Sequence, residues 1–374
     1  MGDAFGPVDP SVEVWRAYCQ AMADAGELVL AAGTPDDPDL RAEGIRALSR
    51  YATFALEKCL ERSDPERPDF VEYQTTIRKY MGDNPDQAYF WAIISGDRSY
   101  RINATMAGAV AVEVGVYAGD YRSDGVRRLV DAVEDTTLRV DPDGAYELLL
   151  TPDPQPDNTN HLRLEPDASS VILRTYFTDR DVRLAHPRPS IEAIPSAGPA
   201  PPFTLDQLRR GLEQAVLYTT GSFGWWVQTR KPPPIAELVN TIQPMHDDGD
   251  LLTPDNVRYL FGDWELGPDE ALVVDFDPSG GADYWGWVLL TYWGESVDWR
   301  NRTAVINGDT AVRRDDGTVR LVVAHEDPGL PNWLDTAGHP TGSLSLRWFR
   351  SDAPLPTADA RVVPFDQLSA LKDQ

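Results

Sequence analysis

Apolar residues in the first part of the chain recur every three or four positions, which is the spacing of a helix with one buried face. One such stripe begins directly after Asp9-Pro10 and a second after Asp37-Pro38, and Asp followed by Pro is typical of a helix N-terminus. A third stripe covers residues 70–81. The pattern therefore predicts a helical N-terminal region over residues 1–86.

From Gln87 onward the apolar pattern alternates with a period of two, and Gly, Pro and Asp clusters separate the runs, as they do between β-strands. The expected strands cover residues 89–94, 100–102, 110–117, 145–150, 171–177, 271–276, 284–293, 319–324 and 343–349. Ser95–Arg98 predicts a hairpin turn between the first two of these strands. Many short strands with loop-rich connections predict β-sandwiches or jelly rolls.

Two features interrupt the strand pattern near the middle of the chain. Six prolines between Pro187 and Pro202 predict a linker, and Thr204 with Gln207 matches the capping box at the start of a helix. Thr253-Pro254 predicts a further short helix that ends at Gly262. The linker and its helix, placed at 187–217, separate two strand-rich regions at 87–186 and 218–374.

The two strand-rich regions resemble each other at a nearly constant offset. Asp143 and Asp316 are 173 residues apart, as are Arg174 and Arg347, and Asn160 and Asn332 are 172 apart. Four matching segments in the same order favour a duplicated β-unit, with 140–177 equivalent to 313–349, over convergence of strand and turn patterns. The expected fold is mainly β with an N-terminal helical region and two tandem jelly-roll-like β-sandwich units.

The C-terminal region resembles a known family in several motifs. They are Tyr284-Trp285, Asp298-Trp299-Arg300, the stretch Asn-Trp-Leu-Asp-Thr-Ala-Gly-His from Asn332 to His339, and Leu346-Arg347-Trp348. These residues resemble the domain-of-unknown-function family numbered 1214, and the Asp83–Asp86 segment resembles the front part of its long actinobacterial-type members. The resemblance implies a jelly-roll-like β-sandwich and brings no established reaction.

Composition excludes several classes of partner. The chain has 60 acidic and 34 basic residues, so its net charge is −26, and such a surface repels nucleic acid and anionic lipid. Cys19 and Cys59 are too few for a disulfide framework or a thiolate zinc site, and both lie on apolar helix stripes, where we expect buried, reduced thiols. No apolar run reaches membrane-spanning length. We expect a soluble cytoplasmic protein, and its oligomeric state stays open.

The sharpest candidates for proton chemistry are Asp335 and His339. A turn between them brings carboxylate and imidazole within hydrogen-bonding reach, and a carboxylate that orients an imidazole yields a general base. The equivalent loop at Asn160 has neither residue, which favours a role specific to the second half. The alternative is a structural loop in which Asp335 caps a turn.

Glu295 and Asp298 form a second pair of candidates. Paired carboxylates divide acid and base work when their environments separate their pKa values. The alternative is that Arg300 or Arg347 pairs with them as ordinary cross-strand ions. The acidic run from His246 to Asp250 is interpreted as a solvated loop, so no metal and no cofactor are expected.

Most of the 11 tryptophans lie in the second half, where core packing or a cleft for ring compounds both account for them. The predicted substrate-binding residues are Trp285, Trp293, His325, Asn332, Trp333 and Arg347. The leading hypothesis is a hydrolase or lyase that acts on a small neutral, carbohydrate-like ring compound. The alternatives are a binding protein or enzyme for a terpenoid- or steroid-like ligand without proton transfer, and a structural or assembly protein.

Overall fold

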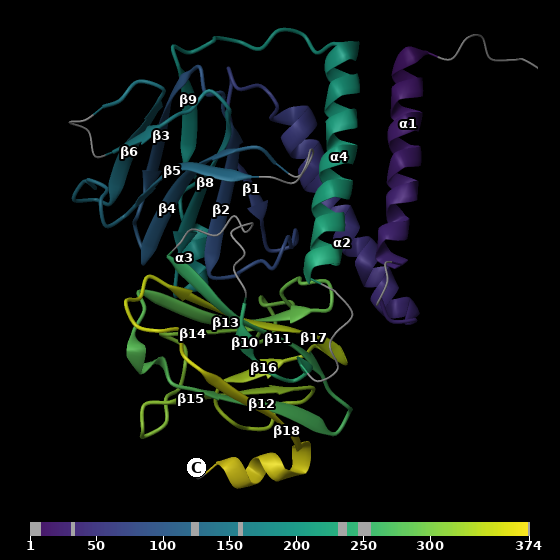
Figure 1. Ribbon diagram of the computed structural model, residues 1–374, viewed down its shortest axis with the longest axis vertical. Helices are drawn as coiled ribbons and strands as arrows, with labels where there is room; N and C mark the ends of the chain where they lie inside the picture. Colours follow the sequence, from purple (N-terminus) through teal and green to yellow (C-terminus); the bar gives the residue numbers. More distant parts are fainter. Residues whose placement is uncertain are drawn as a thin grey trace, which may run out of the picture.

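The computed structural model describes residues 9–30, 34–120, 127–155, 160–230, 238–245 and 256–372 (Figure 1). Its N-terminal region contains helices α1 (Pro10–Ala25) and α2 (Pro38–Leu56), with the short helical turns η1 (Gly26–Leu30) and η2 (Glu57–Glu61) after them. The Asp37 carboxylate accepts hydrogen bonds from the backbone N–H groups of Asp39 and Leu40, at 2.8 and 3.0 Å. Asp9 caps α1 in the same way, so both predicted helix starts are confirmed.

The first β-sandwich unit consists of a five-stranded and a four-stranded sheet. The five-stranded sheet has the order β1 (Val71–Gln74), β2 (Gln87–Ile93), β8 (Ala168–Tyr176), β4 (Ala111–Ala118) and β5 (Arg128–Glu134). The four-stranded sheet has the order β7 (His161–Arg163), β6 (Ala145–Thr151), β3 (Ser99–Thr105) and β9 (Ser190–Ile194), and α3 (Arg180–Ala185) lies between β8 and β9 in the chain. Alternate side chains of both sheets, such as Leu148 and Leu173, form the core between them.

The second unit has the same architecture. Its five-stranded sheet has the order β10 (Gln243–Pro244), β11 (Val257–Glu265), β17 (Thr341–Phe349), β13 (Tyr284–Thr291) and β14 (Val305–Asn307). The four-stranded sheet has the order β16 (Trp333–Asp335), β15 (Val319–Ala324), β12 (Glu270–Phe276) and β18 (Ala358–Pro364). The turns η4 (Pro278–Gly280) and η5 (Phe365–Leu371) complete the unit. The expected fold, mainly β with a helical N-terminal region and two sandwich units, is confirmed.

The equivalence of the two units extends to single hydrogen bonds. The Asn160 side chain accepts from Arg139 N–H and donates to the carbonyls of Arg139 and Glu147. The Asn332 side chain makes the same three bonds, with Val312 N–H and the carbonyls of Val312 and Arg320. Arg174 and Arg347 occupy the seventh position of the matching strands β8 and β17. Duplication of one ancestral β-unit is our interpretation of this equivalence.

Asn332→Ala is expected to lower the free energy of unfolding by about 2–4 kcal/mol, because three backbone groups lose their partner in a buried loop. The residue also has a φ of 55°, a conformation that Ala adopts less readily than Asn. Chemical denaturation measures the effect, with the exposed Asn301→Ala variant as control. Equal losses for the two variants would contradict a structural role for Asn332.

Several predicted elements are wrong, because the local sequence does not show which distant strand each segment pairs with. Residues 71–74 form β1 instead of helix, since Val71, Glu72 and Gln74 pair with β2. Residues 257–265 form β11 instead of a short helix. The turn at Ser95–Arg98 connects β2 to β3 across the sandwich and is no hairpin, because the two strands lie in different sheets.

The residue ranges of the two units also differ from the expected ones, because the pairing partners of their strands were not known. Strand β9 falls within the expected linker, so strands of the first unit run from Val71 to Ile194 instead of staying within 87–186. Helix α4 (Leu205–Arg230) starts at the predicted capping box, in which Gln207 N–H donates to Thr204 Oγ1 at 3.2 Å. It continues beyond the expected end at 217.

The five-stranded sheets of the two units pack together through a shared apolar cluster. Helices α1, α2 and α4 lie along one side of the molecule (Figure 1). Tyr176 of the first sheet contacts Tyr284 and Phe349 of the second, with ring centroids 5.5 and 4.3 Å apart. Cys59 is buried as expected, whereas Cys19 is exposed because nothing described covers that part of α1. Across the described helices, none is long and apolar enough to cross a membrane.

Candidate functional site

Asp335 and His339 do not form the predicted hydrogen bond with each other. The Asp335 carboxylate accepts from Arg302 Nη1 and from the N–H of Ala337, both at 2.7 Å, which makes it the cap of a turn. His339 Nδ1 lies 2.7 Å from the carbonyl oxygen of Thr336, and its Nε2 lies 3.1 Å from Glu43 on α2. The hydrogen bond with Glu43 raises the pKa of His339. Each residue therefore anchors a loop through its own partners.

Glu295 and Asp298 also lie in different surroundings. The buried Glu295 carboxylate forms an ion pair with Arg50 of α2, and burial raises its pKa to about 7. Asp298 is exposed and accepts from the Asn301 side chain at 2.7 Å. The two carboxylates do not share one site.

Stability should fall as the pH rises from about 4.5 to about 7, because folded Glu295 keeps a proton that the unfolded chain has already lost. The contribution of this group is about 3 kcal/mol. In Glu295→Gln the folded and unfolded states no longer differ at this position, so its unfolding free energy should lose that part of the pH dependence. Denaturation at pH 5 and pH 8 measures the difference, with Asp298→Asn as control. A wild-type pH slope in Glu295→Gln would contradict the assignment.

The predicted substrate-binding residues mostly belong to cores and turns. Trp285 lies in the core of the second unit, and Trp293 Nε1 donates to the carbonyl oxygen of Leu40 at 2.8 Å. Trp333 Nε1 donates to the Ala324 carbonyl at 3.1 Å, and His325 Nδ1 lies 2.7 Å from Thr336 Oγ1. Among the predicted site residues, only Arg347 lines the main aromatic cavity of the described structure. The acidic run from His246 to Asp250 lies outside the described residues.

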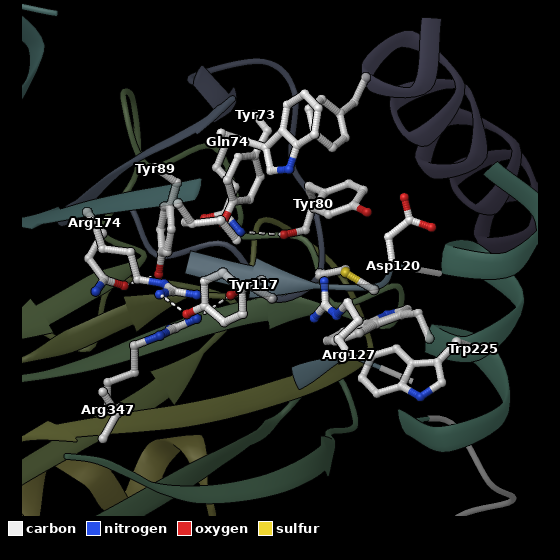
Figure 2. Close-up of a pocket in the computed structure, with 18 of the residues that line it drawn as sticks. Tyr73, Gln74, Tyr80, Tyr89, Tyr117, Asp120, Arg127, Arg174, Trp225 and Arg347 are labelled. Atoms are coloured by element: carbon white, nitrogen blue, oxygen red, sulfur yellow. Dashed lines mark hydrogen bonds between the residues drawn. The ribbon is translucent and has the colours of Figure 1, made fainter. Parts of the chain in front are cut away.

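This cavity has a volume of about 180 Å³ and lies between the two five-stranded sheets and helices α2 and α4. Aromatic rings contribute 12 of its 28 described lining residues: Phe54, Tyr73, Tyr80, Tyr89, Trp91, Tyr117, Tyr176, Tyr218, Trp225, Trp226, Tyr259 and Phe261. Figure 2 shows Tyr89, Tyr117, Arg174 and Arg347 at one end of it, and Asp120, Arg127 and Trp225 at the other. Burial raises the pKa of Tyr89 to about 12, so this phenol remains a neutral hydrogen-bonding group in the cavity.

The described lining of the cavity has more basic than acidic side chains. Its described lining carries four cationic side chains, Lys58, Arg127, Arg174 and Arg347, and one carboxylate, Asp120. The chain itself has a net charge of −26. Lys58 pairs with Asp120 at 3.4 Å, and Arg174 pairs with Glu113 at 2.6 Å. Arg347 is therefore the cation of this lining whose surroundings favour an anionic ligand over a neutral or cationic one.

The equivalent arginines Arg174 and Arg347 differ in their partners. Arg174 Nη1 donates to the Glu113 carboxylate at 2.6 Å and to Tyr117 Oη at 2.8 Å. At the corresponding places of the second unit, 173 residues further on, the chain has Gly286 and Leu290. Neither of these residues offers a side-chain acceptor, so Arg347 has no equivalent of the ion pair between Arg174 and Glu113.

Arg347 is 7% exposed, and its Nη2 donates to the carbonyl oxygen of Gly82. Its Nη1 is buried and has no hydrogen-bond partner among the described residues. The Oε1 atom of Gln74, which also lines the cavity, is likewise buried without a partner there. Burying a guanidinium group with an unpaired donor lowers the stability of the fold, and an anion bound at that donor would offset this cost.

A buried loop holds the Gly82 carbonyl in place. The Asp83 carboxylate accepts from the N–H and the Oγ–H of Ser296, at 2.8 and 2.6 Å, and Lys79 Nζ donates to the same Oγ at 2.6 Å. Asp86 accepts from Asn307 Nδ2 at 2.8 Å. These contacts tie the Asp83–Asp86 segment of the first unit to the second unit, and so fix one wall beside Arg347.

A solved structure of an uncharacterised protein from Burkholderia cenocepacia superposes with a TM-score of 0.86 and 32% sequence identity, covering 94% of this chain and 97% of that one. The chain belongs to the family of this protein. The VPA0106 protein from Vibrio parahaemolyticus shares the fold, with a TM-score of 0.50 and 11% identity over 91% of this chain and 100% of that one. Comparisons with family profiles and with curated proteins found no match, so membership in family 1214 stays a prediction.

Sequence reasoning missed the cavity because its lining comes from segments between Phe54 and Arg347 that meet only in the folded chain. One signal was nevertheless present in the repeat. The aligned strands place Arg174 opposite Glu113 and Arg347 opposite Gly286, so the loss of one counter-ion can be read from the two copies.

Proposed function

We propose that this protein binds a small ring compound that carries an anionic group, of which a carboxylate is the simplest example, in the cavity between the five-stranded sheets. The observation that carries the proposal is the buried Arg347 guanidinium with its open Nη1 donor. A carboxylate placed there receives a charge-assisted hydrogen bond from Arg347. The surrounding phenol and indole rings supply apolar contact for the ring of the ligand.

The size of the cavity supports a ligand with a single ring. An apolar cavity of about 150 Å³ is large enough to hold benzene. The volume of about 180 Å³ therefore accommodates one six-membered ring with a small substituent. A steroid-like skeleton, one of the ligand classes considered from the sequence, is larger than this space.

The proposal is one of binding and assigns no reaction. The residues expected to transfer protons, Asp335, His339, Glu295 and Asp298, do not line the cavity. Of the three hypotheses drawn from the sequence, the aromatic cavity favours the ligand-binding one, with an anionic group added. The structural or assembly role is the alternative in which the cavity binds nothing.

Matched pairs of acids and amides test the proposal. Benzoate, phenylacetate and cyclohexanecarboxylate are each compared with the corresponding carboxamide by thermal shift at constant ionic strength. The acids are expected to raise the melting temperature of the protein, and the amides to leave it unchanged, because only the acids neutralise Arg347. Equal shifts for acids and amides, or no shift with any acid at millimolar concentration, would contradict the proposal.

A further inference from the structure

A second cavity of about 520 Å³ adjoins the first on the side of the first unit and α4. The two cavities share four lining residues, Lys58, Trp91, Asp120 and Ser170. We call the cavity with Arg347 the inner cavity, and the one next to α4 the outer cavity. Because four side chains line both, the two cavities are separated by no more than these common residues.

An ion pair stands where the cavities meet. Lys58 Nζ lies 3.4 Å from the Asp120 carboxylate, and 4.3 and 4.2 Å from the ring centroids of Trp91 and Tyr218. Lys58 belongs to η2, a single π-helical turn at the end of α2, and such turns often occur at functional sites. The wider turn places a buried ammonium group, 5% exposed, at the boundary between the two spaces.

The outer cavity differs from the inner one in chemistry. Its described lining has few aromatic rings and many hydrogen-bonding side chains, including Ser63, Arg67, Ser169, Gln207, Arg210 and Gln214. Its cationic residues Lys58, Arg67 and Arg210 are matched by the carboxylates Asp64, Glu66 and Asp120. A balanced polar lining suits a neutral group with several donors and acceptors, and gives no preference for a charged one.

We infer that one ligand occupies both cavities, with its anionic ring in the inner cavity and a neutral, hydrogen-bonding group attached to that ring in the outer cavity. This inference rests on the proposed function. It adds that the ligand is a conjugate, in which the ring acid carries a second, neutral group. The linking atoms pass beside Lys58 and Ser170. A sugar and a short chain of amides are both neutral and both carry several hydrogen-bond donors and acceptors. An experiment with one conjugate of each kind distinguishes them.

Isothermal titration with three probes tests this inference. The probes are 4-hydroxybenzoate, its 4-O-glucoside, and the N-acetylglycyl amide of 4-aminobenzoate. At least one conjugate is expected to bind ten or more times as tightly as 4-hydroxybenzoate, and the better one identifies the attached group as sugar-like or peptide-like. If 4-hydroxybenzoate binds and neither conjugate gains affinity, the inference fails while the proposed function stands. If none of the three binds, both fail.

Variants that fill the outer cavity provide the second arm. Ser63→Trp places a large side chain in an exposed loop that lines this cavity, and Arg210→Trp does so from the exposed surface of α4. Each is expected to remove the tenfold gain of the conjugate, while Ser49→Trp on the exposed face of α2 retains it. Thermal unfolding confirms that each variant folds. An undiminished gain in both cavity-filling variants would overturn the inference.

Discussion

Replacing Arg174 with Met is expected to lower the free energy of unfolding by about 3–5 kcal/mol, because it leaves the Glu113 carboxylate buried without its partner. Glu113 is 1% exposed, and burial already raises its pKa with Arg174 in place. The equivalent change Arg347→Met removes a guanidinium group that forms no ion pair among the described residues, although the Asp83 carboxylate is close enough to raise its pKa. Because the Gly82 carbonyl loses the hydrogen bond from Arg347 Nη2, the free energy of unfolding should fall by about 1–2 kcal/mol, less than in Arg174→Met.

Denaturant unfolding of the two variants under identical conditions measures this contrast. The two arginines occupy equivalent strand positions and are equally buried, at 6% and 7% exposure, so each serves as the control for the other. Equal losses of stability would mean that Arg347 has an internal counter-ion after all. That result would remove the main reason to expect an anionic ligand.

Trp293→Ala is expected to cost about 3–5 kcal/mol of stability, since it removes a large, fully buried side chain. The indole packs against Phe223 of α4 with ring centroids 6.0 Å apart, and donates to the Leu40 carbonyl of α2. A Cβ atom at Gly44 would lie 2.4 Å from this indole, so the helix approaches it as closely as a glycine allows. Trp293 therefore joins the helical region to the second unit.

Trp333→Ala provides the comparison, because this residue was also predicted to bind substrate and is only partly buried. Its loss should cost about 1–2 kcal/mol. Urea denaturation measures both variants, and ligand titration shows whether either one contacts the ligand. A stable Trp293→Ala variant that no longer binds ring acids would restore the original prediction of a substrate-binding residue.

Features with a local physical cause were predictable from the sequence. The helix starts at Asp9 and Asp37 and the capping box at Thr204 depend on side chains that satisfy nearby N–H groups. The repeat was equally visible, because the side chains of Asn160 and Asn332 bond to backbone groups at equivalent places of their own units. Strands such as residues 319–324 were predicted with the correct bounds, because turn residues separate their apolar runs from the neighbouring sequence.

Features that depend on distant partners were not predictable in this way. Strand β1 has four residues and takes its shape from its pairing with β2. Asp335 and His339 are close in the chain, yet their partners are Arg302 and Glu43, and Glu43 is 296 residues away. The cavity combines residues of both units and two helices, so no single segment of sequence carries its signature.

Titration of one ring acid and its amide against wild type and Arg347→Met tests the central claim most directly. The acid is expected to bind Arg347→Met at least about 30-fold more weakly than wild type, in line with the loss of about 2 kcal/mol from one charge-assisted hydrogen bond. The amide should bind both proteins equally. If Arg347→Met binds the acid as tightly as the wild type does, Arg347 is not the anion-binding residue and the proposed function is wrong.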